Sequence, residues 1–188
     1  SVSGSAEAAA TVKIYGDAAC AGAVLGQGPA GEGPVGSTQP YAVQANAAEN
    51  ITTTFYAKAV DAAGNKSSCS RSKVAYLHDG IVPNTPVLSH TTPATMPANE
   101  IEPLLSGTAE SGATIDVYLG GACAGAKAGS GTATGGSFTV AATVAADTTS
   151  ALYATATDPA GNTSSCSAAV SYTHDGTAPE TPVLSGTD

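Results

Sequence analysis

The residues of this sequence that could do chemistry are its acidic residues and its cysteines, and both recur at matching places in the two halves. The recurring acidic pairs are Glu7 and Glu110, Asp61 and Asp158, and Asp79 and Asp175. Calcium binds six to eight oxygens from carboxylates, carbonyls and amides, and tolerates irregular geometry. An Asp that opens a turn also accepts backbone hydrogen bonds within that turn. The acidic pairs therefore fit a calcium site or a purely structural role in turns.

Four cysteines fall two in each half, at matching positions. Small domains with thin cores often carry disulfides in oxidising compartments, so we predict the bridges Cys20–Cys69 and Cys123–Cys166. Such a bridge needs Cα atoms within about 7 Å, which requires the chain between the cysteines to fold back. Free or differently paired thiols are the alternative. A metal site is less favoured, because the sequence has no C-x-x-C motif and no neighbouring His.

Catalytic motifs are weak in this sequence. His78 and His174 precede Asp79 and Asp175, but neighbours on an extended chain point to opposite sides, so we interpret the histidines as polar linker residues. No G-x-S-x-G, P-loop or HExxH motif occurs. We therefore expect no catalytic residue, no cofactor-binding residue and no enzyme activity.

The composition of the chain excludes some classes of binding partner. The 188 residues carry a formal net charge of −9, and only 11% are charged. This balance argues against nucleic acid and against anionic membrane surfaces as partners. No apolar run of 18 or more residues occurs, so we predict no direct membrane insertion.

An internal repeat sets the domain organisation. The hairpin sequence YAKAVDAAGNKSSCS at 56–70 returns as YATATDPAGNTSSCS at 153–167, and the block 3–23 returns at 106–126. Gly161 and Asn162 tolerate the positive φ that a tight turn needs. We predict a first repeat at 1–80, a second at 81–178, and at 179–188 the first strand of a following or neighbouring repeat.

Alternating residues and turn signals predict an all-β fold with seven short strands in the second repeat. The first five are expected at 86–89, 102–108, 113–119, 123–130 and 137–144, and the recurring hairpin supplies the last two. The returning strand of that hairpin should place Cys166, Ala168, Val170 and Tyr172 on one face. The expected fold is two tandem seven-stranded immunoglobulin-like β-sandwiches, the first without its own initial strand.

The order GTAE-x-GAT-x-D-x-Y, a Gly-rich hairpin, GSFTV, YATATDPAGNTS and D-G-T-A-P resembles the bacterial immunoglobulin-like repeats of large cell-surface and biofilm proteins. The resemblance covers essentially the whole chain, twice. It implies an extracellular structural or adhesive module, used in tandem arrays at the bacterial cell surface and sometimes stiffened by calcium. The paired cysteines depart from the commonest versions of this pattern.

In an immunoglobulin-like sandwich, the N-terminal linker, the loop after the second strand and the loop before the last strand share one end. We therefore expect Asp79, Glu110 and Asp158 to converge on calcium at the junction of the two repeats. The equivalent site would combine Glu7 and Asp61 with Asp175 of a neighbouring copy.

The segment TPVLSGTD at 181–188 repeats TPVLS at 85–89, and the first repeat begins just before its second-strand motif. The tail can run on into the next repeat of a covalent array, or complete the first repeat of another copy by strand addition. Arbitrary chain boundaries with a frayed end are the third explanation.

We therefore predict a stalk or fibre module whose partners are adjacent repeats or other copies of the chain. The alternative is a carbohydrate- or ligand-binding module of an adhesin or secreted enzyme, with surface glycans stacked on Tyr118 and Tyr153. The small number of aromatic residues and the absence of Trp weaken that alternative.

Overall fold

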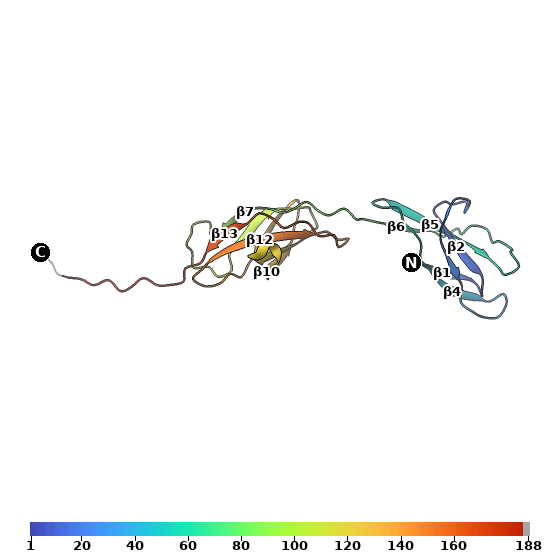
Figure 1. Cartoon of the computed structure of the whole chain (residues 1–188), viewed down its shortest axis with the longest axis horizontal. Coiled ribbons are helices and arrows are strands. Elements are labelled where there is room, and N and C mark those ends of the chain that lie inside the picture. The colour runs from blue at the N-terminus through green and yellow to red at the C-terminus, as the bar shows by residue number, and fades with distance from the viewer. Residues whose placement is uncertain (186–188) are drawn as a thin grey trace. The chain divides into compact units, whose positions relative to one another are not determined.

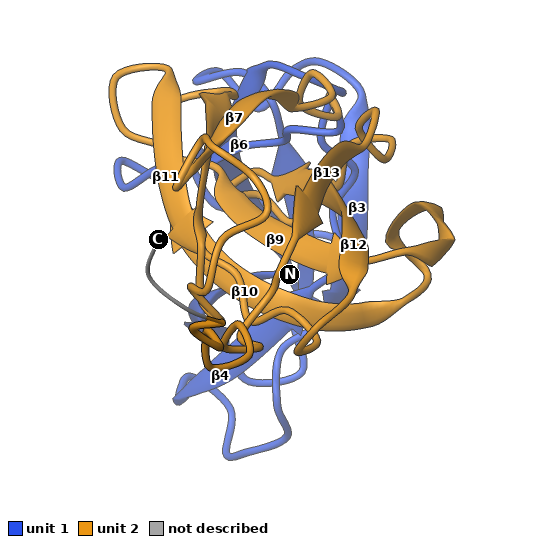
Figure 2. Cartoon of the chain, turned by 90° about the vertical axis from the view of Figure 1, so that its left-hand side faces the viewer, with its two compact units in different colours: residues 1–80 blue, residues 81–188 orange. Residues whose placement is uncertain are grey.

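A computed structural model describes residues 1–185 and shows an all-β protein, as the sequence predicted. The chain divides into two compact units, Ser1–Gly80 and Ile81–Asp188, coloured separately in Figure 2. Within the described residues the helical structure is a single 3-10 turn, η1 (Gly121–Cys123). No described helix has the length and apolar character that a membrane span requires.

Unit 2 contains seven strands in two antiparallel sheets (Figure 1). The first sheet has the order β11-β8-β7 and the second the order β10-β9-β12-β13. The strands are β7 (Val87–Thr92), β8 (Leu104–Thr108), β9 (Thr114–Leu119), β10 (Ala126–Thr132), β11 (Ser137–Ala141), β12 (Thr149–Thr157) and β13 (Val170–Thr173).

Unit 1 repeats this arrangement with six strands. The first sheet contains β1 and β4, and the second has the order β3-β2-β5-β6. The strands are β1 (Val2–Glu7), β2 (Thr11–Tyr15), β3 (Val24–Pro29), β4 (Thr38–Val43), β5 (Thr52–Val60) and β6 (Val74–Leu77). The recurring sequence blocks make β1 the counterpart of β8 and β4 the counterpart of β11. Nothing in unit 1 corresponds to β7.

Each core is built from every second residue of its strands, because successive side chains of a strand point to opposite faces of the sheet. In unit 2, Ile115 and Val117 of β9 are fully buried and pack with Leu105, Leu152 and Tyr172. The core of unit 1 is a smaller set of buried residues. It consists of Val2, Val12, Ile14, Ala30, Val43 and Phe55.

A glycine beneath an aromatic ring marks the same place in both first sheets. Gly4 pairs with Tyr41 across β1 and β4, and Gly107 pairs with Phe138 across β8 and β11. A Cβ on Gly4 would come within 3.0 Å of the Tyr41 ring, and one on Gly107 would meet the Phe138 ring. The shared glycine lets each ring lie flat over its neighbouring strand.

Several predicted strand bounds differ from the observed strands. The returning hairpin strand begins at Val170 and not at Cys166, and Ala168 is exposed while Tyr172 is buried, so these residues do not share one face. The fourth strand begins at Ala126, because η1 turns the chain through the residues before it. The first strand reaches Thr92, beyond the predicted end. The predicted strand at 179–188 extends into 186–188, outside the described residues, and 179–185 form no strand.

Candidate functional site

The recurring hairpin turn is closed by an Asp–Asn pair in each unit. Asp158 accepts hydrogen bonds from the Asn162 backbone N–H (2.9 Å) and side-chain amide (2.8 Å). Asp61 accepts the same two bonds from Asn65, each 2.8 Å long. The Asn amide holds the pKa of each carboxyl below its ordinary value. The carboxylates therefore stabilise the turns while they are charged.

After this turn, two serines supply the hydrogen bonds that a paired returning strand would normally make to the preceding strand. The backbone N–H groups of Ala154 and Ala156 donate to the hydroxyls of Ser167 and Ser164, at 2.9 and 3.0 Å. The N–H groups of the same serines donate back to the Ala154 and Ala156 carbonyls. Ser70 and Ser67 make the same exchange with Ala57 and Ala59 in unit 1. We call this pair of serines the serine clamp.

The serine clamp explains why a cysteine at its centre can leave the sheet. Each clamp reads Ser-Ser-Cys-Ser, and the cysteine lies between the two serines that bind the strand. Cys69 and Cys166 thereby reach Cys20 and Cys123 in the preceding hairpin loops, with Cα atoms 5.6 and 5.8 Å apart. Both disulfides have the pairing predicted from the sequence. The spacing of hydroxyls three residues apart is the signal by which the clamp could have been found.

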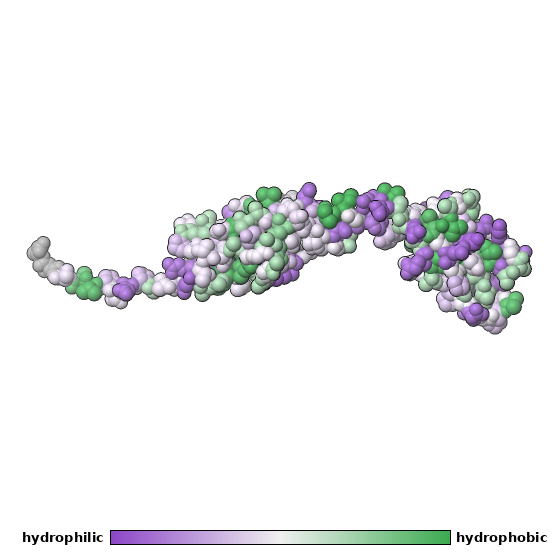
Figure 3. All heavy atoms as spheres, in the orientation of Figure 1, coloured by the Kyte–Doolittle hydropathy of each residue, from purple (hydrophilic) through white to green (hydrophobic). Residues whose placement is uncertain are grey.

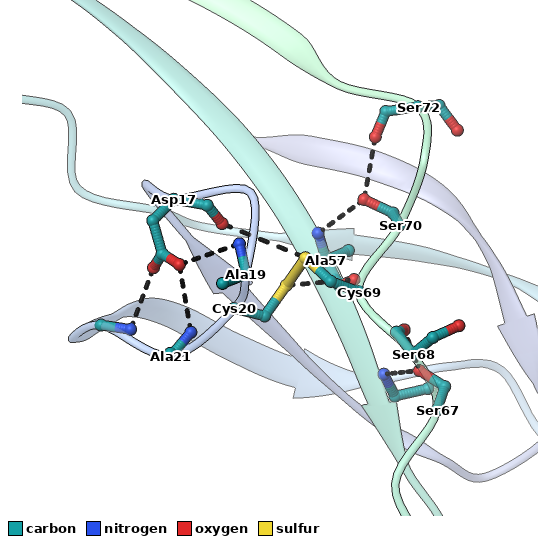
Figure 4. Close-up of a disulfide and its surroundings, with 12 residues drawn as sticks. Asp17, Ala19, Cys20, Ala21, Ala57, Ser67, Ser68, Cys69, Ser70 and Ser72 are labelled. Atoms are coloured by element: carbon teal, nitrogen blue, oxygen red, sulfur yellow. Dashed lines mark hydrogen bonds between the residues drawn. A yellow bond between two sulfur atoms is a disulfide. The ribbon is translucent and has the colours of Figure 1, made fainter.

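The loop that carries Cys20 is held by Asp17, as Figure 4 shows beside Ala57 of β5. The Asp17 carboxylate accepts hydrogen bonds from the N–H groups of Ala19, Ala21 and Gly22, at 2.9–3.2 Å. The bonds from Ala21 and Gly22 are the main reason that the pKa of Asp17 lies below its ordinary value. Cys20 and Cys123 both have positive φ. In both loops the cysteine therefore lies in the left-handed region of φ.

The histidines of the HDG sequences, which we interpreted as polar linker residues, each bind a loop of their own unit. His174 is buried, and its Nδ1 accepts a hydrogen bond from the Asp147 N–H at 2.9 Å. Asp147 Oδ1 in turn accepts from the Gly176 N–H at 2.7 Å. In unit 1, Nδ1 of His78 accepts from the Asn50 N–H at 3.4 Å, and Gly80 donates to Asn50 at 2.7 Å. This arrangement ties the end of each unit to its own loop.

The acidic residues proposed as calcium ligands do not form a cluster within either unit. Over residues 1–185 the structure contains no group of three or more His, Cys, Asp or Glu side chains close enough to hold a metal. Glu110 is exposed, and Asp158 binds Asn162 in its own turn. Glu7 lies at the end of β1, and Asp61 lies in the unit 1 turn. Asp175 accepts a hydrogen bond from the Thr177 N–H at 3.0 Å, and Asp79 also has a bonded partner. Calcium binding stays a prediction.

The two tyrosines considered for sugar binding lie directly opposite each other. Tyr118 on β9 pairs with Tyr153 on β12, and both are half-buried. Asp116 lies on the same strand two residues before Tyr118 and forms an ion pair with Lys127 and a hydrogen bond with Ser130. The face therefore carries two tyrosines at opposite positions of neighbouring strands, beside a carboxylate that already has partners.

Unit 1 contains a groove of about 550 Å³ between its two sheets. One wall is formed by β1, from Val2 to Glu7, and the opposite wall includes Phe55 of β5 and Val74 of β6. β1 pairs with β4 on one side only, so its other side offers backbone groups for pairing.

In unit 2 the corresponding place is filled by β7. Val87 and Leu88 pair with Thr108 and Gly107 of β8. Leu88 packs against the core of the unit, whereas the side chain of Val87 is exposed. A Cβ on Gly107 would lie 2.4 Å from the Val87 carbonyl oxygen, so glycine allows β7 to approach. Gly4 is the counterpart of Gly107, and it leaves the same space for a neighbouring strand beside β1.

Comparisons with known proteins identify the fold family of unit 2. Residues 91–173 match a family described as bacterial Ig domain. This match confirms the predicted resemblance to bacterial immunoglobulin-like repeats. A comparison with curated proteins finds no match.

Among solved structures, one described as "Biofilm associated protein - BSP domain" is similar to this chain. The two are 19% identical, with a TM-score of 0.34. The match covers 94% of this chain and 28% of the other, so the chain spans little more than a quarter of that structure.

Proposed function

We propose that this chain, a bacterial Ig domain preceded by a unit of the same strand order, is a structural module of an extracellular stalk or fibre. Its units associate head to tail with adjacent repeats or with other copies. The observation that carries this proposal is the open groove beside β1, in the place that β7 occupies in unit 2. Two disulfides in 188 residues support an oxidising, extracellular location.

The occupant we propose for the groove is the 181–185 segment of a neighbouring copy, with the residues that follow it. This segment repeats the sequence that forms the start of β7. Val183 and Leu184 are 90% and 95% exposed, and Figure 3 shows an apolar patch on the extended C-terminal segment. If this segment paired with β1 in the register of β7 on β8, Leu184 would lie opposite Gly4 and enter the groove, as Leu88 packs against the core of unit 2. Val183 would then point outward, as Val87 does.

Association in solution tests this proposal. Leu184→Asp should weaken association of the full chain by more than about tenfold, because burying one Leu contributes about 1.5–3 kcal/mol. Val183→Asp is the matched control, since that side chain would remain in solvent. Sedimentation velocity across a concentration series measures both. Equal association of the two variants, or no association of the wild-type chain at any concentration, would count against strand addition between copies.

Calcium bound by Asp79, Glu110 and Asp158, and by Glu7, Asp61 and Asp175, is a second proposal, made from the sequence. Its support is the recurrence of the acidic residues in register. A non-enzymatic role accords with the bacterial Ig family of residues 91–173. The carbohydrate-binding alternative is tested by a glycan array on the wild-type chain, with Tyr153→Ala as the control.

A further inference from the structure

The outer face of the second sheet of unit 1 carries a row of polar side chains on three neighbouring strands. Lys13 of β2 lies directly opposite Gln27 of β3 on one side and Lys58 of β5 on the other. Residues paired in this way point to the same side of a sheet. It is the outer side, because Val12 and Ile14, the neighbours of Lys13 in sequence, are buried in the core. We call Gln27, Lys13 and Lys58 the lysine row.

The two lysines of this row place like charges directly opposite each other, an arrangement that destabilises a sheet. Over residues 1–185, neither Lys13 nor Lys58 forms an ion pair with an acidic side chain. Asp61 follows Lys58 by three residues, but its carboxylate binds Asn65 in the hairpin turn. The lysine row therefore holds positive charge that no ion pair within the described residues balances.

The corresponding row of unit 2 is balanced within the unit. Asp116 of β9 stands at the position of Lys13, and it lies opposite Ser130 of β10 and Thr155 of β12. The Asp116 carboxylate forms a 2.6 Å ion pair with Lys127 and accepts a 2.6 Å hydrogen bond from the Ser130 hydroxyl. The same sheet is thus built with satisfied side chains at these three positions, so the fold does not require the opposed lysines of unit 1.

Basic residues are concentrated in unit 1. Five of the six Lys and Arg residues of the chain lie there, and none of the five has a basic counterpart at the matching position of unit 2. Lys66 is exposed, and its bridge to Val60 makes it a diagonal neighbour of Lys58. Diagonal neighbours of this kind lie about 7–8 Å apart. Lys66 therefore extends the positive charge beyond the end of the lysine row.

We infer that the lysine row binds a linear polysaccharide that carries carboxylate groups along its length. Neighbouring strands lie about 4.7–4.9 Å apart, so the row presents three donor side chains in a line across the sheet. The ammonium groups of Lys13 and Lys58 would bind sugar carboxylates, and the Gln27 amide would bind a sugar hydroxyl. A bound carboxylate would also offset the repulsion between the two lysines. The inference does not depend on strand addition, because these side chains belong to the outer face of the sheet.

Two other polyanions match the lysine row less well. Nucleic acid binding relies on the neutralisation of many phosphates, whereas this row has two lysines in a chain with a net charge of −9. The acidic unit 2 of another copy is the second, but its carboxylates at Asp116, Asp147 and Asp158 already bind partners in their own unit. A polysaccharide with free carboxylates is therefore the occupant that the row favours.

The ligand class is tested with the 188-residue chain and oligomers of polygalacturonate, with the methyl-esterified oligomer as the uncharged control. Titration calorimetry at low and at high salt should show binding of the acid form that weakens with salt, because exposed charges are screened. The ester should not bind. A single-stranded DNA oligonucleotide of matched charge is the comparison for phosphate. No binding of the acid form, equal binding of the ester, or tighter binding of the DNA would overturn the inference.

Lys13→Gln together with Lys58→Gln tests the lysine row itself. This variant should bind polygalacturonate at least about tenfold more weakly, because two charged contacts are lost. Its melting temperature should not fall, since the opposed like charges are removed. Lys13→Gln alone should give an intermediate loss of affinity. Ser165→Glu with Ala169→Glu changes the net charge equally at exposed positions of unit 2 and should bind as the wild type does. Equal weakening in both double variants, or unchanged binding in the lysine variant, would overturn binding by the row.

Discussion

At the residue scale, the turn carboxylates do their work in the charged state. Asp158 and Asp61 each bind an Asn four residues ahead through both the backbone and the side chain. Because these bonds lower the pKa in the folded protein, the stabilisation is present above the unfolded pKa of about 3.9. It is lost as the pH falls through the lower folded pKa. The contribution of these bonds should therefore decline only below the pH at which an unfolded Asp takes up its proton.

Asn162→Ala tests which bond holds the carboxylate. Removing the amide should raise the pKa of Asp158 toward its ordinary value, since the Asn162 side chain is the largest cause of the shift. Asp61, whose partner Asn65 is untouched, serves as the reference within the same molecule. Carboxyl NMR titration measures both. An unchanged Asp158 pKa in this variant would show that the backbone bonds suffice.

At the scale of elements, each disulfide joins the returning segment of one hairpin to the loop of another. The bridged cysteines are 49 and 43 residues apart in sequence. Closing loops of this length restricts the unfolded chain, and the loop-entropy estimate is about 4 kcal/mol for each bridge. For units with cores as small as these, that contribution is a large fraction of typical domain stability.

Replacing both cysteines of one bridge tests this contribution. Cys123→Ser with Cys166→Ser should lower the free energy of unfolding of unit 2 by about 2–4 kcal/mol. The transition of unit 1 should not move. Ser165→Ala, an exposed change beside Cys166, is the control and should leave the unfolding midpoint unchanged. Urea denaturation followed by hydrogen exchange resolves the two units. A loss as small as that of the control would mean that the serine clamp holds the segment without the bridge.

The sequence predicts these elements unevenly. Alternation and turn residues locate most strands, and the matched cysteines lead to the correct disulfides because both copies obey the same constraint. The serine clamp escapes such reasoning, because hydroxyls of Ser164 and Ser167 imitate a strand partner without strand periodicity. The burial of His174 escapes it too, since the Asp147 loop that surrounds it is distant in sequence. The clamp leaves a recurring spacing of two serines three residues apart as its signal, whereas the burial of His174 depends on a contact that no local pattern encodes.

At the scale of the whole molecule, calcium remains the open prediction. If the recurring acidic residues bind calcium, the ion should stabilise the chain in proportion to its occupancy. We expect a higher melting temperature in millimolar calcium than in EDTA. Glu110→Gln together with Asp79→Asn should abolish the difference, while Glu49→Gln, outside the proposed set, should preserve it. Superimposable melting curves with and without calcium would end the proposal.

Under the proposed strand addition, the unpaired side of β1 determines how copies of the chain would assemble. In strand addition, one copy contributes a segment and the other copy contributes the groove. Because these two surfaces differ, the contact is heterologous and does not produce a closed dimer. Copies joined in this way would form a string with a vacant acceptor at one end and an unused donor at the other. Such a string is polar: a new copy joins one end through its donor segment and the other end through its groove, and the contact formed is the same. A single free donor peptide, added early, would cap one end and leave the other competent.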